Sequence, residues 1–119
     1  MNAETARALT SISHHKTELE VSKYQDKMIS YIEDQIKAQC GFGYSSYSVD
    51  PMTVICKAHQ YVHGNSNIIR KAVVMLIKDH FRENGFDVKY QVHTKRSDRF
   101  DGFEKFYDLT IRWSEDDKA

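Results

Sequence analysis

Apolar residues recur every three or four positions through the first two thirds of the chain, and at every second position in the last third. The first periodic run begins at Thr17, where Thr17 and Glu20 have the spacing of a capping box. Its apolar positions are Val21, Tyr24, Met28, Tyr31, Ile32 and Ile36. This pattern predicts an amphipathic helix that starts at Thr17.

A second helix is expected after the chain's only proline. Asp50 can accept hydrogen bonds from the first free amides, and Pro51 suits the first helical turn because its missing N–H costs nothing there. Gly64 suits a left-handed exit. These signals predict a helix over residues 51–63.

A third helix is predicted to follow at once, capped by Asn65 or Ser66 and stopped by Gly85. The stretch from Ala72 to Ile77 is apolar on nearly every side of this helix. We therefore expect it to be the most buried element.

After Gly85 the pattern becomes that of two β-strands, FDVKYQVH and KFYDLTIRW. One antiparallel register pairs the apolar residues of both strands, and it also sets unlike charges opposite each other on the other face. Its pairs are Val92 with Tyr107, Tyr90 with Leu109, Val88 with Ile111, Phe86 with Trp113, Asp87 with Arg112, Lys89 with Thr110 and Gln91 with Asp108. The linking segment, TKRSDRFDGFE, is too long for a tight turn.

The stretch QCGFGYSSYSVDP joins the first helix to the second. Phosphate-binding loops follow a strand and open a helix, whereas these glycines follow a helix. We interpret Gly41 as the C′ residue that stops the helix and Gly43 as room for the turn. The segment near residues 43–49 is open to two conformations, irregular or a short strand beside the hairpin.

Together these elements predict an α+β fold of three helices packed on a C-terminal antiparallel β-hairpin, because an isolated hairpin is marginal in water. With a third strand near 43–49, the order becomes that of a winged helix-turn-helix domain. A single domain is expected over 17–113, since 119 residues bury one core. Residues 1–16 are expected as a flexible N-terminal arm or a short helix, and residues 114–119 as a solvated acidic tail.

Composition limits the partners. The 17 Lys and Arg balance the 17 Asp and Glu, so a nucleic acid or an anionic membrane would have to be met by a local patch. No apolar run reaches the length of a membrane span, and the N-terminus lacks the pattern of a signal peptide. With two cysteines and no disulfide pattern, the chain is expected in a cytoplasm, neither secreted nor at a membrane.

Aromatic residues in the irregular segments exceed what the proposed core uses, and rigid aromatic rings are common at protein interfaces. The leading hypothesis is therefore a non-enzymatic protein that binds a protein partner. Its candidate contacts are Phe42, Tyr44, Tyr47, Phe100 and Phe103. The alternative is that several of these rings only cap the edge of the core.

The competing hypothesis is a winged-helix-like nucleic-acid binder, with the third helix as recognition helix and the long loop as wing. Its candidate phosphate contacts are Arg70, Lys71, Lys95, Arg96 and Arg99. Against it, the third helix is rich in isoleucine, valine and methionine, and Asp98 and Asp101 interrupt the basic loop.

Metal binding and catalysis have less support. Cys56, His59 and His63 fall at i, i+3 and i+7 on one side of the second helix, which suits zinc, but no second cysteine pair is present. No nucleophile has an evident base and orienting group. We expect no metal, no cofactor and no enzymatic activity.

The run IIRKAVVMLIKDHFRENGFDVKY leading into FYDLTIRW resembles the small α+β accessory proteins of tailed bacteriophages, over about residues 66–113. The resemblance implies binding to a host factor or a virion component, in the host cytoplasm if the protein is phage-encoded. It brings no catalytic residues and leaves the oligomeric state open.

Overall fold

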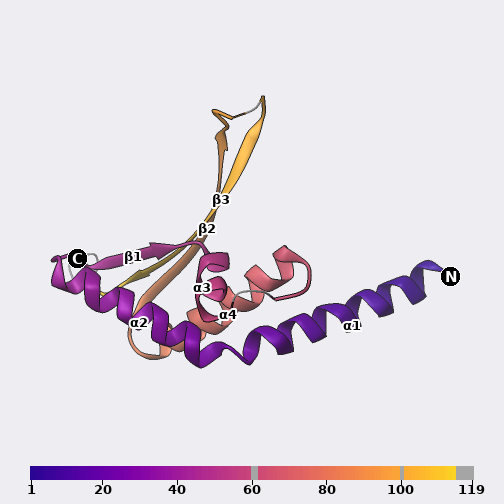
Figure 1. Cartoon of the computed structure of the whole chain (residues 1–119), viewed down its shortest axis with the longest axis horizontal. Helices are drawn as coiled ribbons and strands as arrows, with labels where there is room; N and C mark the ends of the chain where they lie inside the picture. The colour runs from indigo at the N-terminus through magenta and orange to yellow at the C-terminus, as the bar shows by residue number, and fades with distance from the viewer. Residues whose placement is uncertain (60–61, 100, 115–119) are drawn as a thin grey trace.

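The structure is a computed structural model that describes residues 1–59, 62–99 and 101–114. Within these residues, helices pack on a three-stranded antiparallel sheet (Figure 1). The elements are α1 (Ala3–Ser22), α2 (Gln25–Gly41), β1 (Ser46–Val49), α3 (Pro51–Ala58), α4 (Ser66–Glu83), β2 (Asp87–Arg96) and β3 (Phe103–Arg112). The predicted α+β fold with its C-terminal hairpin is confirmed, with one helix more than expected. Beyond Ser114, the expected acidic tail lies outside the described residues.

The additional helix is α1, which covers most of the segment expected as an arm. Asn2 caps it, and its side chain accepts a hydrogen bond from the amide of Thr5 at 2.8 Å. The prediction that the first helix starts at Thr17 is wrong. Thr17 lies inside α1, is buried, and its hydroxyl donates to the carbonyl of Ser13 at 3.1 Å.

α1 ends where the sequence pattern predicts a continuous helix. The hydroxyl of Ser22 donates to the carbonyl of Leu19 at 2.7 Å, and the amide of Tyr24 donates to the carbonyl of Val21 at 3.0 Å. Such local bonds compete with the regular i→i−4 pattern and tighten the last turn. The chain therefore turns before α2 begins at Gln25.

Both long helices that precede a strand end in a Schellman motif. After α2, Gly43 has a φ of +83° and its amide donates to the carbonyl of Cys40 at 3.0 Å, while Tyr44 reaches back to Gln39 at 2.9 Å. Gly43 is therefore the C′ residue, and the expectation of Gly41 in that place is wrong. The glycines do stop a helix, as predicted.

α3 begins as predicted and ends early. Asp50 caps it, accepting from the amide of Met52 at 2.8 Å, with Pro51 in the first turn. The helix ends at Ala58, and His59 has an extended backbone. The ring of His59 stacks on Tyr24 with centroids 4.3 Å apart, and this contact holds His59 out of the helix. The prediction of a helix over residues 51–63 is wrong at its C-terminal end, where residues 60–61 lie outside the described part.

The sheet has the strand order β1-β3-β2, with β3 in the centre. The predicted hairpin register is confirmed from the pair of Asp87 with Arg112 to that of Val92 with Tyr107. The expected pair of Phe86 with Trp113 lies past the end of the ladder, where the two rings meet edge-on at 6.2 Å. The optional third strand exists as β1, antiparallel to β3.

The core lies between the helices and one face of the sheet. α4 contributes the most buried side chains of any helix, as expected: Ile69, Val73, Val74, Ile77 and Phe81. Met28 and Ile32 of α2, Val54 and Ile55 of α3, and Val88, Leu109 and Ile111 of the hairpin complete its centre. No helix in the described residues is both long and apolar enough to cross a membrane.

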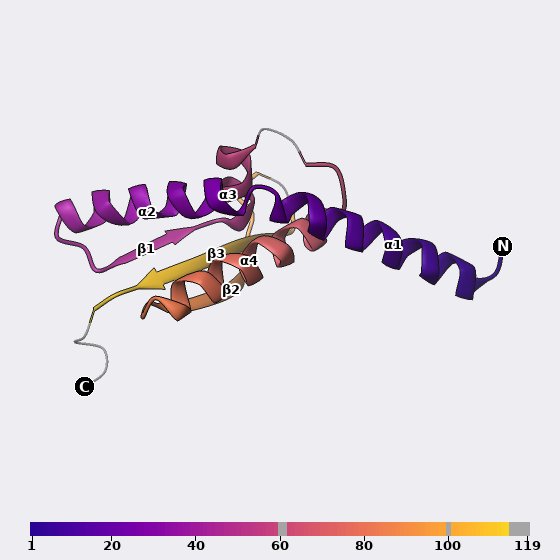
Figure 2. The same ribbon diagram turned by 90° about the horizontal axis from the view of Figure 1, so that it is seen from below.

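Two parts extend from this core (Figures 1 and 2). The N-terminal half of α1 projects at one end, and the outer half of the β2–β3 hairpin rises away from the helices. The principal extents are 57 × 38 × 31 Å. Both projections expose side chains on more than one side, so they are the parts best placed to meet another molecule.

Candidate functional site

The exposed side of α4, called here the α4 face, is polar and carries charges of both signs. It consists of Asn67, Lys71, Met75, Asp79, Arg82 and Glu83, with the half-buried Lys78 beside them. The isoleucines and valines that argued against a recognition helix are mostly buried on the other sides of α4. The α4 face therefore carries the basic side chains of Lys71 and Arg82 as well as the carboxylates of Asp79 and Glu83.

Arg70 connects α4 to the hairpin. Its guanidinium carbon lies 3.6 Å from the ring centroid of Tyr107, and its Nη1 donates to the side-chain oxygen of Asn67 at 2.9 Å. Its Nε is buried without a hydrogen-bond partner among the described residues. A cation over a tyrosine ring contributes about 0.5–2 kcal/mol. Arg70 is therefore committed to holding the start of α4 against β3, which makes it a poor candidate for a phosphate contact.

The charge of Arg70 also acts on Tyr90, the residue that pairs with Leu109. Burial raises the pKa of Tyr90, and the nearby Arg70 guanidinium partly opposes that rise. The phenol therefore stays neutral at physiological pH. At the far end of α4, Arg82 donates to the carbonyl of Val88 at 2.8 Å and fixes the helix to β2.

Residues 93–106, called here the outer hairpin, present two different faces because side chains alternate along a strand. Thr94, Arg96, Phe103 and Lys105 share the face of Tyr107 and of the core. His93, Lys95, Glu104 and Phe106 lie on the opposite face. Lys105 is two residues before Tyr107 on β3, so the two side chains are neighbours on the same face of the strand. Lys105 therefore lies beside the ring that Arg70 covers.

The structure separates basic residues that are neighbours in the sequence. Arg96 faces the α4 side, whereas Lys95 lies opposite Glu104 in the register and 5.4 Å from the ring centroid of Phe106. Lys105 was not among the predicted contacts. Lys105 could have been identified from the predicted hairpin register, because that register places it on the same face as Tyr107.

Ser97 organises the tip of the outer hairpin. Its amide donates to the carbonyl of Gly102 at 2.9 Å, and its hydroxyl accepts from the amide of Arg99 at 3.1 Å and lies 3.2 Å from an oxygen of Glu104. Arg99 is exposed at this tip, next to Asp98. Phe100, a predicted protein contact, lies outside the described residues.

The remaining predicted aromatic contacts are not gathered on one surface. Phe42 and Tyr44 are 76% and 64% exposed in the turn after α2, and Phe103 is 70% exposed on the outer hairpin. Tyr47 pairs with Ile111 near one end of β3, whereas Phe103 starts the other end. A ten-residue strand at about 3.3 Å per residue spans roughly 30 Å. The two predicted contact segments are thus at different ends of the molecule (Figure 1).

Tyr47 has a structural role. Its side chain is half-buried and its hydroxyl lies 3.5 Å from that of Tyr31 on α2. Burial, and secondarily the bond to Tyr31, raise the pKa of Tyr47 above its usual value. Of the residues in that segment, only Phe42 and Tyr44 are free to serve as large exposed contacts.

The three metal candidates are not arranged as predicted. Because α3 ends at Ala58, only Cys56 remains on the helix, where it is exposed. His59 stacks on Tyr24, and His63 lies in the connection to α4. Across the described residues, no three or more His, Cys, Asp or Glu side chains are placed to hold a metal ion.

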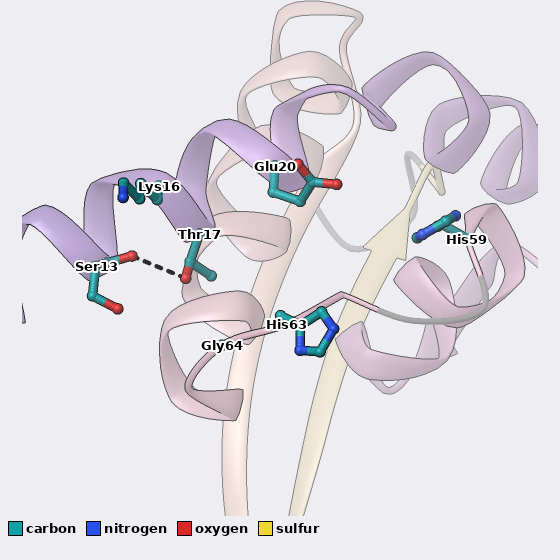
Figure 3. A pocket seen from close by; sticks show the side chains of 7 residues that line it. All are labelled: Ser13, Lys16, Thr17, Glu20, His59, His63 and Gly64. Atoms are coloured by element: carbon teal, nitrogen blue, oxygen red, sulfur yellow. Dashed lines mark hydrogen bonds between the residues drawn. The ribbon is translucent and has the colours of Figure 1, made fainter.

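An open depression of about 700 Å³ lies between α1 and the connection that precedes α4 (Figure 3). It is lined by Ser13, Lys16, Thr17, Glu20, His59, His63 and Gly64. The carboxylate of Glu20 pairs with Lys23 at 3.0 Å, and this bond lowers the pKa of Glu20. An acid held in its charged form by a lysine is a weak general acid.

The chain matches no protein-family model, no curated protein and no solved structure. Its function is therefore argued from the positions of the side chains described above.

Proposed function

We propose that the protein binds nucleic acid as winged helix-turn-helix domains do, with α4 as the recognition helix and the outer hairpin as the wing. The order α2, β1, α3, α4, β2, wing, β3 and the strand order β1-β3-β2 support this assignment. The third strand, on which the assignment depended, is present as β1.

The observation that carries the proposal is a surface of basic side chains on a chain with no net charge. α4 supplies Lys71 and Lys78, and the neighbouring face of the outer hairpin supplies Arg96 and Lys105. On that face of the outer hairpin, Thr94, Arg96, Phe103 and Lys105 include no carboxylate. Each basic side chain that neutralises a phosphate releases a counterion, so binding should be strongly salt-dependent.

The test compares the two faces of the outer hairpin. Arg96→Ala together with Lys105→Ala removes two charges from the face beside α4, and Lys95→Ala removes one charge from the opposite face. We expect the double variant to weaken binding to duplex DNA or RNA by about eightfold per lost contact at 0.1 M salt, and to reduce the salt slope by about 0.9 per contact. Lys95→Ala should leave affinity within about twofold of the unmodified protein.

Fluorescence anisotropy with random-sequence duplexes between 50 and about 200 mM salt measures both quantities. The proposal fails if the unmodified protein shows no salt-dependent binding at the lowest salt. It also fails if Lys95→Ala weakens binding as much as Arg96→Ala together with Lys105→Ala does, since the faces would then be irrelevant.

A second function, binding of a protein partner, is favoured by the exposure of Phe42 and Tyr44. The Schellman turn holds both rings on rigid backbone, so little conformational entropy is lost when they are buried by a partner. In line with the phage resemblance, the proposed partner is a host factor or a virion component. No catalytic residue enters either proposal.

Phe42→Ala with Tyr44→Ala should abolish capture of such a partner, while Phe103→Ala, an equally exposed ring at the far end of β3, should not. Capture by the double variant at the unmodified level would remove this second function. Circular dichroism of each variant checks that the fold is intact.

A further inference from the structure

One face of the outer hairpin, called here the open face, continues the core side of the sheet beyond the helices (Figure 1). The register assigns to it Thr94 and Arg96 of β2, and Phe103 and Lys105 of β3. All four side chains are exposed, because the outer hairpin rises away from the helices that cover the rest of this face. An aromatic ring and two cations therefore share one uncovered surface.

The two cations flank the ring of Phe103 in different directions. Arg96 is directly opposite Phe103 in the register, and such neighbours on antiparallel strands have Cβ atoms about 4.5–5.5 Å apart. Lys105 lies on the same face two residues further along β3, a rise of about 7 Å. The ring is 70% exposed, so its surface stays available between them.

The opposite face of the outer hairpin has a ring and a cation too, but in a different arrangement. Phe106 is 41% exposed, and Nζ of Lys95 lies 5.4 Å from its ring centroid. Lys95 is also opposite Glu104, and Nε2 of His93 lies 3.1 Å from a carboxylate oxygen of Asp108. Carboxylates thus accompany the cations on this opposite face, and they repel phosphate, whereas the strand residues of the open face include none.

We propose that the open face binds single-stranded nucleic acid, with an unpaired base stacked on Phe103 and the neighbouring phosphates near Arg96 and Lys105. An exposed ring accepts any unpaired base, because every base has a π-face, and basic side chains beside it hold the backbone. In a duplex the base faces are already stacked on each other and do not reach such a ring. This binding mode rests on the proposed function and names the form of nucleic acid that the outer hairpin meets.

Charge decides along which part of the hairpin the strand lies. Asp98 and Asp101 are in the tip, where they disfavour a phosphate. At the other end of the open face, Arg70 adds a positive charge, with its guanidinium carbon 3.6 Å from the ring centroid of Tyr107. The single strand therefore lies between Phe103 and α4, and not over the tip. A duplex with a single-stranded extension is the ligand that fits both surfaces.

The test compares oligothymidylate with an abasic oligomer of the same length, which keeps the phosphates and has no bases. Phe103→Ala should weaken binding of oligothymidylate about 5- to 150-fold, the range for the loss of one stacked base, and should leave binding of the abasic oligomer unchanged. Phe103→Trp should retain the affinity, whereas Phe103→Leu should not, because only a ring stacks on a base. Phe106→Ala is the matched control, since it removes a ring from the opposite face and should change neither affinity.

Fluorescence anisotropy measures these affinities, and circular dichroism checks the fold of each variant. Equal effects of Phe103→Ala on the two oligomers, or of Phe103→Ala and Phe106→Ala on oligothymidylate, would overturn stacking on the open face.

Failure of the stacking and failure of the proposed function give different results. Binding of a blunt duplex without binding of oligothymidylate would overturn the stacking alone. Binding of oligothymidylate that depends on Phe103, without binding of a duplex, would support the stacking and overturn α4 as a recognition helix. No salt-dependent binding of either would overturn both, and the open face would then be a surface for an acidic protein.

Discussion

The junction between α1 and α4 allows one glycine to be tested against two others that have the same kind of backbone. Gly64 has a φ of +141°, and a Cβ atom built on it would lie 2.5 Å from the hydroxyl oxygen of Thr17. Gly43 and Gly85 also have positive φ angles, +83° and +89°, but a Cβ at either would meet nothing within 4 Å. Changing each of the three glycines to alanine and comparing the losses in free energy of unfolding therefore isolates the cost of the clash with Thr17 at Gly64.

For Gly43→Ala and Gly85→Ala we expect a loss of about 1–2 kcal/mol, the cost of a left-handed conformation for an L-residue. Gly64→Ala adds a clash with Thr17, which is buried and bonded to Ser13, so it cannot move without losing packing and a hydrogen bond. Overpacking costs about 1–3 kcal/mol and the bond about 0.5–1.5 kcal/mol. We expect a total of about 2.5–6.5 kcal/mol, with a midpoint about three times the loss expected at Gly85.

Urea unfolding followed by circular dichroism measures these free energies of unfolding. Thr17→Ala removes the two atoms nearest the new Cβ, so the double variant with Gly64→Ala should be less destabilised than the sum of the single changes. The reasoning is refuted if Gly64→Ala costs no more than Gly85→Ala, or if the two changes are additive.

Two further predictions concern the sheet. Burial raises the pKa of Tyr47, so its neutral form contributes to the stability of the folded state. This contribution is fully present below the ordinary tyrosine pKa of about 10 and is lost as the pH rises through the raised pKa. Tyr47→Phe should therefore flatten the fall of the urea midpoint between about pH 9.5 and 11. Leu109→Ala, at a fully buried site between β1 and β2, should cost about 2–5 kcal/mol. Val92→Ala, on the same face but 52% exposed, should cost less than about 1 kcal/mol, and a similar loss at both positions would contradict the assigned core.

The hairpin register was predictable because two independent patterns agree on it. Only one alignment sets Val88 beside Ile111 on the apolar face and Asp87 beside Arg112 on the other, and a shift by one residue would reverse both faces. Caps were also predictable at Asp50 and Asn65, because the bonds that define them form within a few residues.

The two helix ends that were predicted wrongly belong to one tertiary contact. α1 ends just before Tyr24 and α3 ends just before His59, and the rings of these two residues stack. Periodicity continues through both positions. At the end of α1 the local bonds of Ser22 and Tyr24 tighten the last turn, whereas the local sequence gives no reason for α3 to stop at Ala58. A contact between residues far apart in the chain overrides the local preference, and only the folded arrangement of α1 and α3 reveals it.

The distribution of charge on the outer hairpin could not be predicted from composition either. Equal numbers of acidic and basic residues argue against a nucleic-acid partner only if the charges are evenly mixed in space. Along the outer hairpin, strand alternation sends Lys95 and Glu104 to one face and Arg96 and Lys105 to the other. The sheet thus leaves Lys95 opposite Glu104, where the two charges offset each other, and sets Arg96 and Lys105 on the other face. A variant that changes Lys95 and Arg96 together would average over two faces with different neighbours. Single substitutions on opposite faces are the form of experiment that this geometry requires.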